Sequence, residues 1–150
     1  MKAEITQEHV WLRRLVGEWG YEVPGPDGGT IRGTETVRML GEAWLVLEGR
    51  GEMQTLMTIG FDPLARCFVG TWIGSMMNHL WVYRGGALDA TQRLLSLPTE
   101  GPSFDEPGKM ALYRDEIEIV GDDERLLHGN SLGADGQFTR FMTARYQRVK

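Results

Sequence analysis

The sequence predicts an all-β protein: an up-and-down antiparallel β-barrel of about ten strands, with a short N-terminal helix covering one end. Twenty glycines stand singly or in pairs between apolar runs, which is typical of short strands joined by tight turns. The strand-like runs recur at intervals of roughly 8–14 residues, and no helix-length pattern separates them. The connections are short, apart from a moderately long loop near residues 98–108. Greek-key sandwiches need long return connections, and closure leaves no exposed strand edge, so a barrel is favoured.

The N-terminal helix is predicted by an N-cap, an apolar stripe and a stop signal. Thr6 is a suitable N-cap, and Val10, Trp11 and Leu15 recur at helical spacing. Gly17 then ends the helix, because glycine readily adopts the conformation that closes a helix C-terminus. We expect this helix to cover an open end of the core.

The strands that follow are rich in apolar residues, and turn residues bound them. Clusters of Gly, Pro and Asp mark the clearest turns, at residues 24–29, 62–66, 102–108, 121–124 and 133–136. No composition shift or internal repeat divides the chain, so residues 1–150 are expected to form one domain. The predicted strands lie within residues 19–23, 30–40, 41–53, 54–61, 67–77, 78–85, 86–101, 109–120, 125–132 and 137–149.

Composition excludes several classes of function. The chain has 16 Lys and Arg against 21 Asp and Glu, and its arginines form no block, which argues against a nucleic-acid partner. Cys67 is the single cysteine, so no intrachain disulfide can form, and a reducing, cytoplasmic location is expected. The N-terminus lacks the apolar core of a secretory signal, and no apolar stretch approaches a membrane span, so no membrane partner is expected. A homodimer is the default oligomer, because cyclic dimers are the commonest assemblies.

The junction between the helix and the first strand resembles the signature of a known family. "GEW", residues 17–19, resembles the Gly-x-Trp signature of lipocalins and their calycin relatives, in which the Trp plugs one end of the barrel. The chain from about residue 9 to 149 looks like bacterial lipocalin-like domains of unknown function, in the stretches "LVGEW", "GEAWLVLEGRG", "IGFDP", "FVGTWIGSM", "LWVYRGGAL", "LYRD" and "RYQRV". The resemblance implies a barrel with a cavity for a small, mostly apolar molecule, and no particular activity. It also implies an arginine packed over Trp19, for which Arg145 and Arg148 are the candidates.

Strand alternation identifies candidate ligand-binding residues, because successive side chains of a barrel strand point alternately inward and outward. Large flat side chains with a few polar tips are typical of a small-molecule pocket, and the eight methionines suit an adaptable wall. The alternative is that the same aromatic side chains simply fill the core. We place inside the barrel Met57, Trp72, His79, Trp81 and Tyr83.

Arg114 and Arg140 lie in strand-like runs among apolar residues, and each has three interpretations. They could form internal ion pairs, for which Glu35, Glu48 and Asp115 are available, because a buried charge must be paired. They could instead hold an anionic ligand group, since a guanidinium matches a carboxylate with two hydrogen bonds. The third interpretation is an outward-facing, solvated side chain. Both arginines join the candidate ligand-binding set.

His79 is the titratable residue with the widest range of roles. It could be a hydrogen-bonding anchor, a general acid or base, a haem ligand, or a structural histidine bonded to a backbone carbonyl. No serine lies in a nucleophile elbow, and no catalytic residue can be assigned. Three scattered histidines and one cysteine do not make a metal site, so we expect neither metal nor cofactor.

We favour a protein that binds a small hydrophobic or amphipathic molecule in the barrel lumen, with a carboxylate or a phenol as options for its polar group. The alternative is a barrel enzyme that performs acid–base chemistry such as decarboxylation or isomerisation. That enzyme requires His79, Tyr83 and Arg114 within hydrogen-bond reach of one point in the cavity. A haem-binding barrel with His79 or His128 as axial ligand, and a purely structural or interaction domain, rank below these two.

Overall fold

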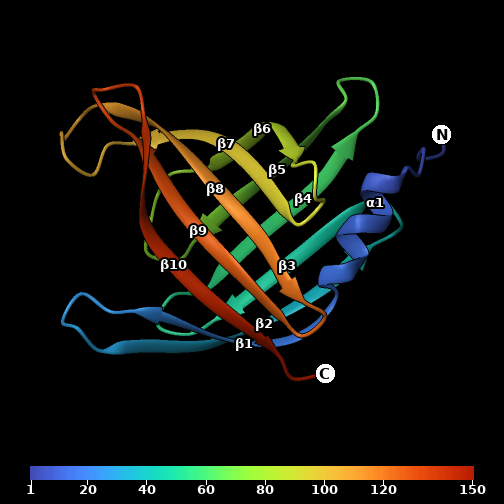
Figure 1. The fold of residues 1–150 in the computed structure, drawn as a ribbon, viewed down its shortest axis with the longest axis horizontal. Coiled ribbons are helices and arrows are strands. Elements are labelled where there is room, and N and C mark those ends of the chain that lie inside the picture. Colours follow the sequence, from blue (N-terminus) through green and yellow to red (C-terminus); the bar gives the residue numbers. More distant parts are fainter.

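The structure, a computed structural model, describes residues 1–150 and confirms the predicted closed antiparallel barrel. Each strand is hydrogen-bonded to the strands before and after it, and the first strand pairs with the last to close the barrel (Figure 1). The barrel therefore has no edge strand, although the pairing between β6 and β7 is confined to Ala87–Leu88 and Leu95–Ser96. The ten strands are β1 (Gly17–Pro24), β2 (Thr30–Leu40), β3 (Trp44–Arg50), β4 (Thr55–Asp62), β5 (Cys67–Gly74), β6 (Trp81–Leu88), β7 (Leu94–Pro102), β8 (Met110–Gly121), β9 (Glu124–Leu132) and β10 (Phe138–Arg148).

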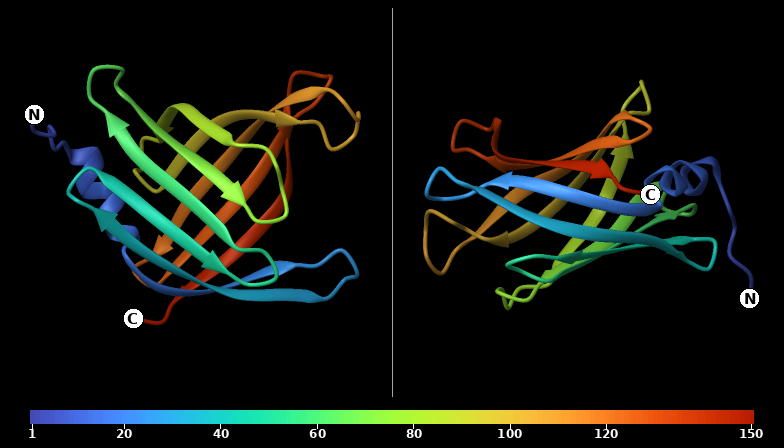
Figure 2. Two further views of the ribbon diagram at one scale, coloured as in Figure 1. Left: turned by 180° about the vertical axis from the view of Figure 1, so that it is seen from behind. Right: turned by 90° about the horizontal axis from the view of Figure 1, so that it is seen from below.

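The N-terminal helix covers one end of the barrel, as predicted (Figures 1 and 2). It is shorter than the apolar stripe indicated, because α1 (Gln7–Leu12) passes into a 3-10 turn, η1 (Arg13–Leu15). Thr6 is the N-cap, and the indole N–H of Trp11 donates to the backbone carbonyl of Gln92 at 2.7 Å. No helix of the chain is both long enough and apolar enough to cross a membrane.

Trp19 closes the barrel beneath the helix. It is buried, and its indole N–H donates to the backbone carbonyl of Leu15 at 2.9 Å. The guanidinium of Arg148 lies 4.3 Å from the centre of the Trp19 ring and donates to two backbone carbonyls at the helix-to-strand junction. Arg148 is therefore the arginine over this tryptophan, whereas Arg145 pairs with Glu124 on the barrel surface.

The two ends of the barrel differ. At the helix end, buried Leu12 and Leu15 belong to the same hydrophobic cluster as Ile59 and Leu95 inside the barrel. The opposite end, called here the open end, carries the connections β1–β2, β3–β4, β5–β6, β7–β8 and β9–β10 (Figure 2). The packed core thus lies toward the helix, and any internal space must open away from it.

Several predicted strand boundaries are wrong, and two of the differences concern β6. The run 78–85 begins too early, because residues 75–80 connect β5 to β6 and the strand starts at Trp81. The run 86–101 holds parts of two strands, since its first residues continue β6 and a turn at 89–93 precedes β7. The first of these differences changes the position of one predicted site residue.

Candidate ligand-binding site

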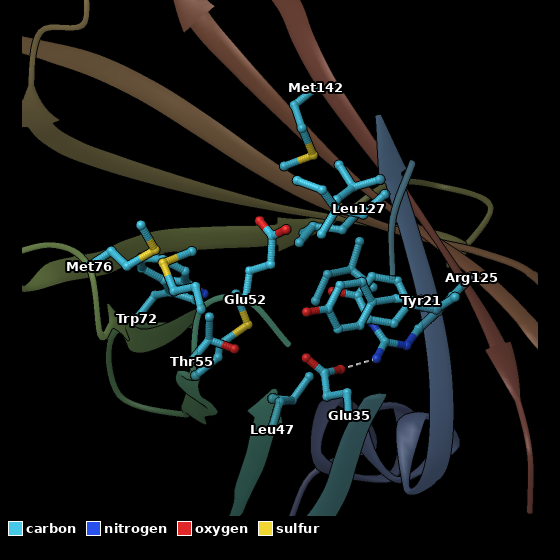
Figure 3. Close-up of a pocket in the computed structure, with 17 residues that line it drawn as sticks. Tyr21, Glu35, Leu47, Glu52, Thr55, Trp72, Met76, Arg125, Leu127 and Met142 are labelled. Carbon is cyan, nitrogen blue, oxygen red and sulfur yellow. Dashed lines mark hydrogen bonds and ion pairs between the residues drawn. The ribbon is translucent and has the colours of Figure 1, made fainter. Parts of the chain in front are cut away.

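The barrel encloses a cavity of about 350 Å³, called here the main cavity. Thirteen of its 17 lining residues are hydrophobic, and they come from strands around most of the barrel together with the β3–β4 and β5–β6 connections of the open end (Figure 3). The alternation of each strand sets which side chains reach it. The lining residues are Tyr21, Val23, Ile31, Glu35, Leu47, Glu52, Met53, Thr55, Met57, Trp72, Met76, Ile117, Arg125, Leu127, Met142, Ala144 and Tyr146.

A buried ion pair lies at one side of the main cavity. Arg125, near the start of β9, pairs through Nη2 with Oε1 of Glu35 on β2 (Figure 3). The guanidinium also lies 3.9 Å from the ring centre of Tyr146 and 4.7 Å from that of Trp19. The guanidinium of Arg125 therefore packs against two aromatic rings, those of Trp19 and Tyr146, and the carboxylate of Glu35 compensates its charge.

Two tyrosines, Tyr21 and Tyr146, line the cavity next to this pair. The ring centres of Tyr21 and Tyr146 are 5.4 Å apart. Burial raises the pKa of both hydroxyls, and the charge of Glu35 raises each pKa further, so both stay protonated at neutral pH. Figure 3 marks only the Arg125–Glu35 contact among the lining side chains, so these hydroxyls do not hydrogen-bond to one another or to the rest of the lining.

A second space of about 160 Å³, called here the side chamber, adjoins the main cavity. Four residues line both spaces: Met57, Trp72, Leu127 and Met142. Ten of the 11 residues around the side chamber are hydrophobic, and the exception is Asp115. The residues that line only the side chamber are Met77, Trp81, Tyr83, Phe104, Tyr113, Asp115 and Phe141.

Asp115 and Tyr83 form a short hydrogen bond across this chamber. The Tyr83 hydroxyl donates to Oδ2 of Asp115 at 2.5 Å. The pKa of Asp115 is raised to about 6, chiefly by burial. The hydrogen bond from Tyr83 lowers this pKa, and the neighbouring charge of Glu116 raises it. Burial and the charge of Asp115 also raise the pKa of Tyr83. At neutral pH the pair is thus a carboxylate that accepts a hydrogen bond from a neutral phenol.

Four of the seven predicted site residues face the interior. Met57 and Trp72 line both spaces, and Trp81 and Tyr83 line the side chamber. Their inward direction follows the alternation read from the sequence. Their contact with a ligand stays a prediction.

His79 does not face the lumen, and its predicted position is wrong. It lies on the β5–β6 connection, where Nε2 makes a 3.0 Å hydrogen bond with the backbone carbonyl of Glu100, and its ring packs edge-on against Trp81 at 4.8 Å. This is the structural role that the sequence left open, a histidine bonded to a backbone carbonyl. Strand alternation fails here because the residue precedes the strand.

Arg114 and Arg140 lie on the outer face of the barrel, so their predicted place in the lumen is wrong. Alternation on β8 turns Asp115 inward, and Arg114 and Glu116 therefore point outward. Both guanidinium groups approach the buried carboxylate of Glu116, at 3.5 Å from Arg114 and 3.2 Å from Arg140. The ion-pair interpretation holds for both arginines, but their partner is none of the three carboxylates proposed from the sequence.

These positions bear on two of the alternative functions. His79 lies on the β5–β6 connection, Tyr83 points into the barrel, and Arg114 lies on its outer face. The three side chains therefore do not meet at one point, as the acid–base enzyme requires. His128 lies on the outer face of β9, bonded at 2.8 Å to both Thr143 and Glu118, so neither candidate haem ligand faces the lumen. No group of three or more His, Cys, Asp or Glu side chains could hold a metal ion.

The lining residues that the sequence analysis missed include Tyr21, Tyr146, Arg125 and, as site residues, Glu35 and Asp115. Arg125 follows the acidic turn 121–124, which is typical of a solvated position. Alternation counted back from Leu127 would have turned it inward. The same count from Ile117 would have placed Asp115 inside, with Arg114 outside.

Comparison with known proteins identifies a family and a general likeness to other barrels. No curated protein matches the chain. Among solved structures, a redesigned beta barrel has 12% sequence identity and a TM-score of 0.40, with 93% of this chain and 95% of that chain covered. A de novo designed fluorescence-activating beta barrel has 14% identity and a TM-score of 0.39, with 91% and 95% covered. Residues 4–148 match the family described as "Protein of unknown function (DUF1579)". Because the match spans nearly the whole chain, the protein belongs to the DUF1579 family.

Proposed function

We propose that this protein binds a small, mostly apolar molecule in the main cavity of its barrel. The observation that carries the proposal is the cavity itself. Its volume is about 350 Å³, and its wall is mainly hydrophobic, with several polar side chains clustered at one side. Small-molecule sites have volumes of about 300–1,000 Å³, apolar walls and a few placed polar groups. The volume falls at the lower end of that range, which favours a small ligand.

The charges around the cavity favour a hydroxyl or phenol over a carboxylate as the polar group of the ligand. The ionisable lining residues are two acids, Glu35 and Glu52, and one base, Arg125, whose Nη2 already binds Glu35. A ligand carboxylate would therefore enter a site with no unpaired cation and with acidic residues nearby, at a high desolvation cost. A ligand hydroxyl can instead exchange hydrogen bonds with Tyr21 and Tyr146.

We keep the lipocalin or calycin type of barrel as part of the proposal. Trp19 at the start of β1, with Arg148 packed over it, supports that type. The ten strands differ from the eight of lipocalin barrels, so the likeness concerns the plugged end and not the strand number. A small molecule, and neither nucleic acid nor membrane, is the proposed partner, and we place the protein in the cytoplasm.

The test uses N-phenyl-1-naphthylamine, an uncharged probe whose fluorescence rises in apolar surroundings. Leu127→Trp puts a larger side chain where both spaces meet, so we expect the affinity of the probe to fall by about tenfold or more. Leu126→Trp is the matched control, because it makes the same change one residue away on the outer face of β9. Equal effects of the two variants, or unchanged affinity in Leu127→Trp, would exclude binding in the lumen.

The polar group is tested by displacement of that probe with two aromatic compounds of similar shape. We expect 2-naphthol to displace it at lower concentration than 2-naphthoate, and Tyr21→Phe to reduce the difference. A preference for the carboxylate would overturn the assignment of the polar group and leave the cavity proposal intact.

A further inference from the structure

The side chamber has an unusual wall, because six of its 11 lining residues are aromatic. Their rings contact one another edge to face: Trp81 and Tyr113 are 5.4 Å apart between ring centres, and Phe104 and Phe141 are 5.6 Å apart. The face of an aromatic ring carries partial negative charge and attracts cations. Rings from β5, β6, β8, β10 and the β7–β8 connection together enclose this small space.

The single charged group in that wall lacks a counter-ion. Asp115 forms no salt bridge, and the residues opposite it on the neighbouring strands are Leu97 and Gly129, which carry no charge. The groups that influence its titration are Tyr83, which donates a hydrogen bond to it, and Glu116, which adds a like charge. A half-buried carboxylate in an apolar wall is costly unless a cation approaches it.

Trp81 provides a further observation that points to a ligand. Its side chain is buried, and its indole Nε1 has no hydrogen-bond acceptor in the protein. Buried indole N–H groups ordinarily find a partner. A ligand acceptor next to the cationic group could supply one.

We propose that the side chamber binds the ammonium group of an organic amine or quaternary ammonium compound, held by the aromatic rings and the carboxylate of Asp115. The apolar remainder of the ligand extends into the main cavity past Met57 and Leu127, which line both spaces. This inference rests on the proposed function and specifies the ligand class. The two polar regions then have separate roles, since the tyrosines of the main cavity bind a neutral polar group and the side chamber binds a cation.

The test compares benzyltrimethylammonium with its uncharged carbon isostere, 2,2-dimethylpropylbenzene, by the shifts of the indole N–H signals in ¹H–¹⁵N spectra. The two probes have nearly the same shape, so a difference in affinity reports the charge. We expect the cation to bind at least about tenfold more tightly and to shift the Trp81 signal, which Trp81→Phe identifies. We also expect its affinity to fall as the pH is lowered below the pKa of Asp115, while that of the isostere stays constant.

Asp115→Asn should reduce the preference for the cation several-fold, because the amide keeps the shape and a hydrogen bond with Tyr83 but has no charge, which leaves the attraction of the aromatic rings alone. Glu100→Gln is the matched control, since it removes the same charge from an exposed position on β7 that lines neither space, and it should change the affinity less than twofold. Equal affinity of the two probes, or a preference that Asp115→Asn does not reduce, would overturn the inference.

The naphthylamine experiment separates this inference from the proposed function. If that probe binds in the lumen and the two benzyl probes bind equally, the lumen binds ligands and the inference about ammonium is wrong. If no probe binds in the lumen, both proposals fail together.

Discussion

The buried pair between Arg125 and Glu35 predicts a large, non-additive effect on stability. Their side chains are only 2% and 9% exposed. Arg125→Met keeps an unbranched side chain between Trp19 and Tyr146 but leaves Glu35 as an uncompensated buried charge. Removing one member of a buried pair costs about 3–5 kcal/mol, which is a large share of the roughly 5–15 kcal/mol that stabilises a typical domain. For a chain of this length, each kcal/mol lowers Tm by roughly 2–4 °C, so we expect a decrease of roughly 6–20 °C.

The double variant Glu35→Leu/Arg125→Met should recover most of that loss. Replacing a whole buried pair with apolar side chains of similar size is often neutral or stabilising, because neither charge then has to be desolvated. We expect the double variant to unfold within about 1 kcal/mol of the wild type, and hence a coupling of at least about 2 kcal/mol in the double-mutant cycle. Urea unfolding followed by tryptophan fluorescence and circular dichroism gives the four free energies.

The pair of Glu22 and Arg32 is the control, because it joins β1 and β2 on the surface with side chains that are 56% and 70% exposed. Its coupling should not exceed about 1 kcal/mol. The reasoning about Arg125 is refuted if Arg125→Met costs less than about 1 kcal/mol, or if the two single losses simply add. Either outcome would mean that water solvates Glu35 in the cavity, which would also weaken the case for an apolar ligand.

Two further predictions concern backbone strain and pH. Gly17→Ala should lower the free energy of unfolding by about 1–3 kcal/mol in urea titrations, because Gly17 has φ of 147° and a Cβ there would clash with Arg148 and the carbonyl of Lys150. Gly20→Ala on the same strand has open space around it and should change stability by less than about 1 kcal/mol, so equal effects would contradict the steric argument. Because the pKa of Asp115 rises from 3.8 to about 6 on folding, the folded chain binds more protons between these values, and its unfolding free energy should fall as the pH rises through them. Asp115→Asn lacks this term, so its stability relative to the wild type should grow by up to about 3 kcal/mol between pH 4 and 7. A constant difference across that range would contradict the shift.

Alternation along strands explains which parts of the site could be predicted from the sequence. Met57, Trp72, Trp81 and Tyr83 were placed inside by a period of two, and each lines an internal space. This inference needs only the local strand and does not depend on knowing which strands pair. His79 was misplaced because it lies two residues before its strand begins, where the backbone is irregular and the period no longer applies.

Charged residues on both faces of β8 made its orientation harder to read. Arg114, Asp115 and Glu116 are consecutive, so their composition does not indicate which face is buried. The inward direction of Asp115 follows instead from Tyr113 and Ile117, the apolar residues that share the inner face of β8 with it. A charge can therefore be placed only after the apolar residues of the same strand have been placed.

The pair of Glu35 and Arg125 could not be predicted from any local pattern. The two residues are 90 positions apart, and their strands, β2 and β9, are separated by β1 and β10 in the barrel. Their contact depends on closure of the sheet, which brings side chains of non-adjacent strands together across the lumen. Hydrogen-bond register between neighbouring strands carries no information about such contacts.

The internal charges divide into one that the protein compensates and one that it does not. Arg125 binds Glu35 and packs against Trp19, so this pair belongs as much to the plug of the helix end as to the cavity. Asp115 has only a neutral phenol as its partner, and its raised pKa shows that folding destabilises its charged form. A sequence optimised for stability alone would place an apolar residue there, and residues that break such a rule are concentrated at functional sites. The uncompensated carboxylate is therefore the residue from which we expect the proposed selectivity for an ammonium group to arise.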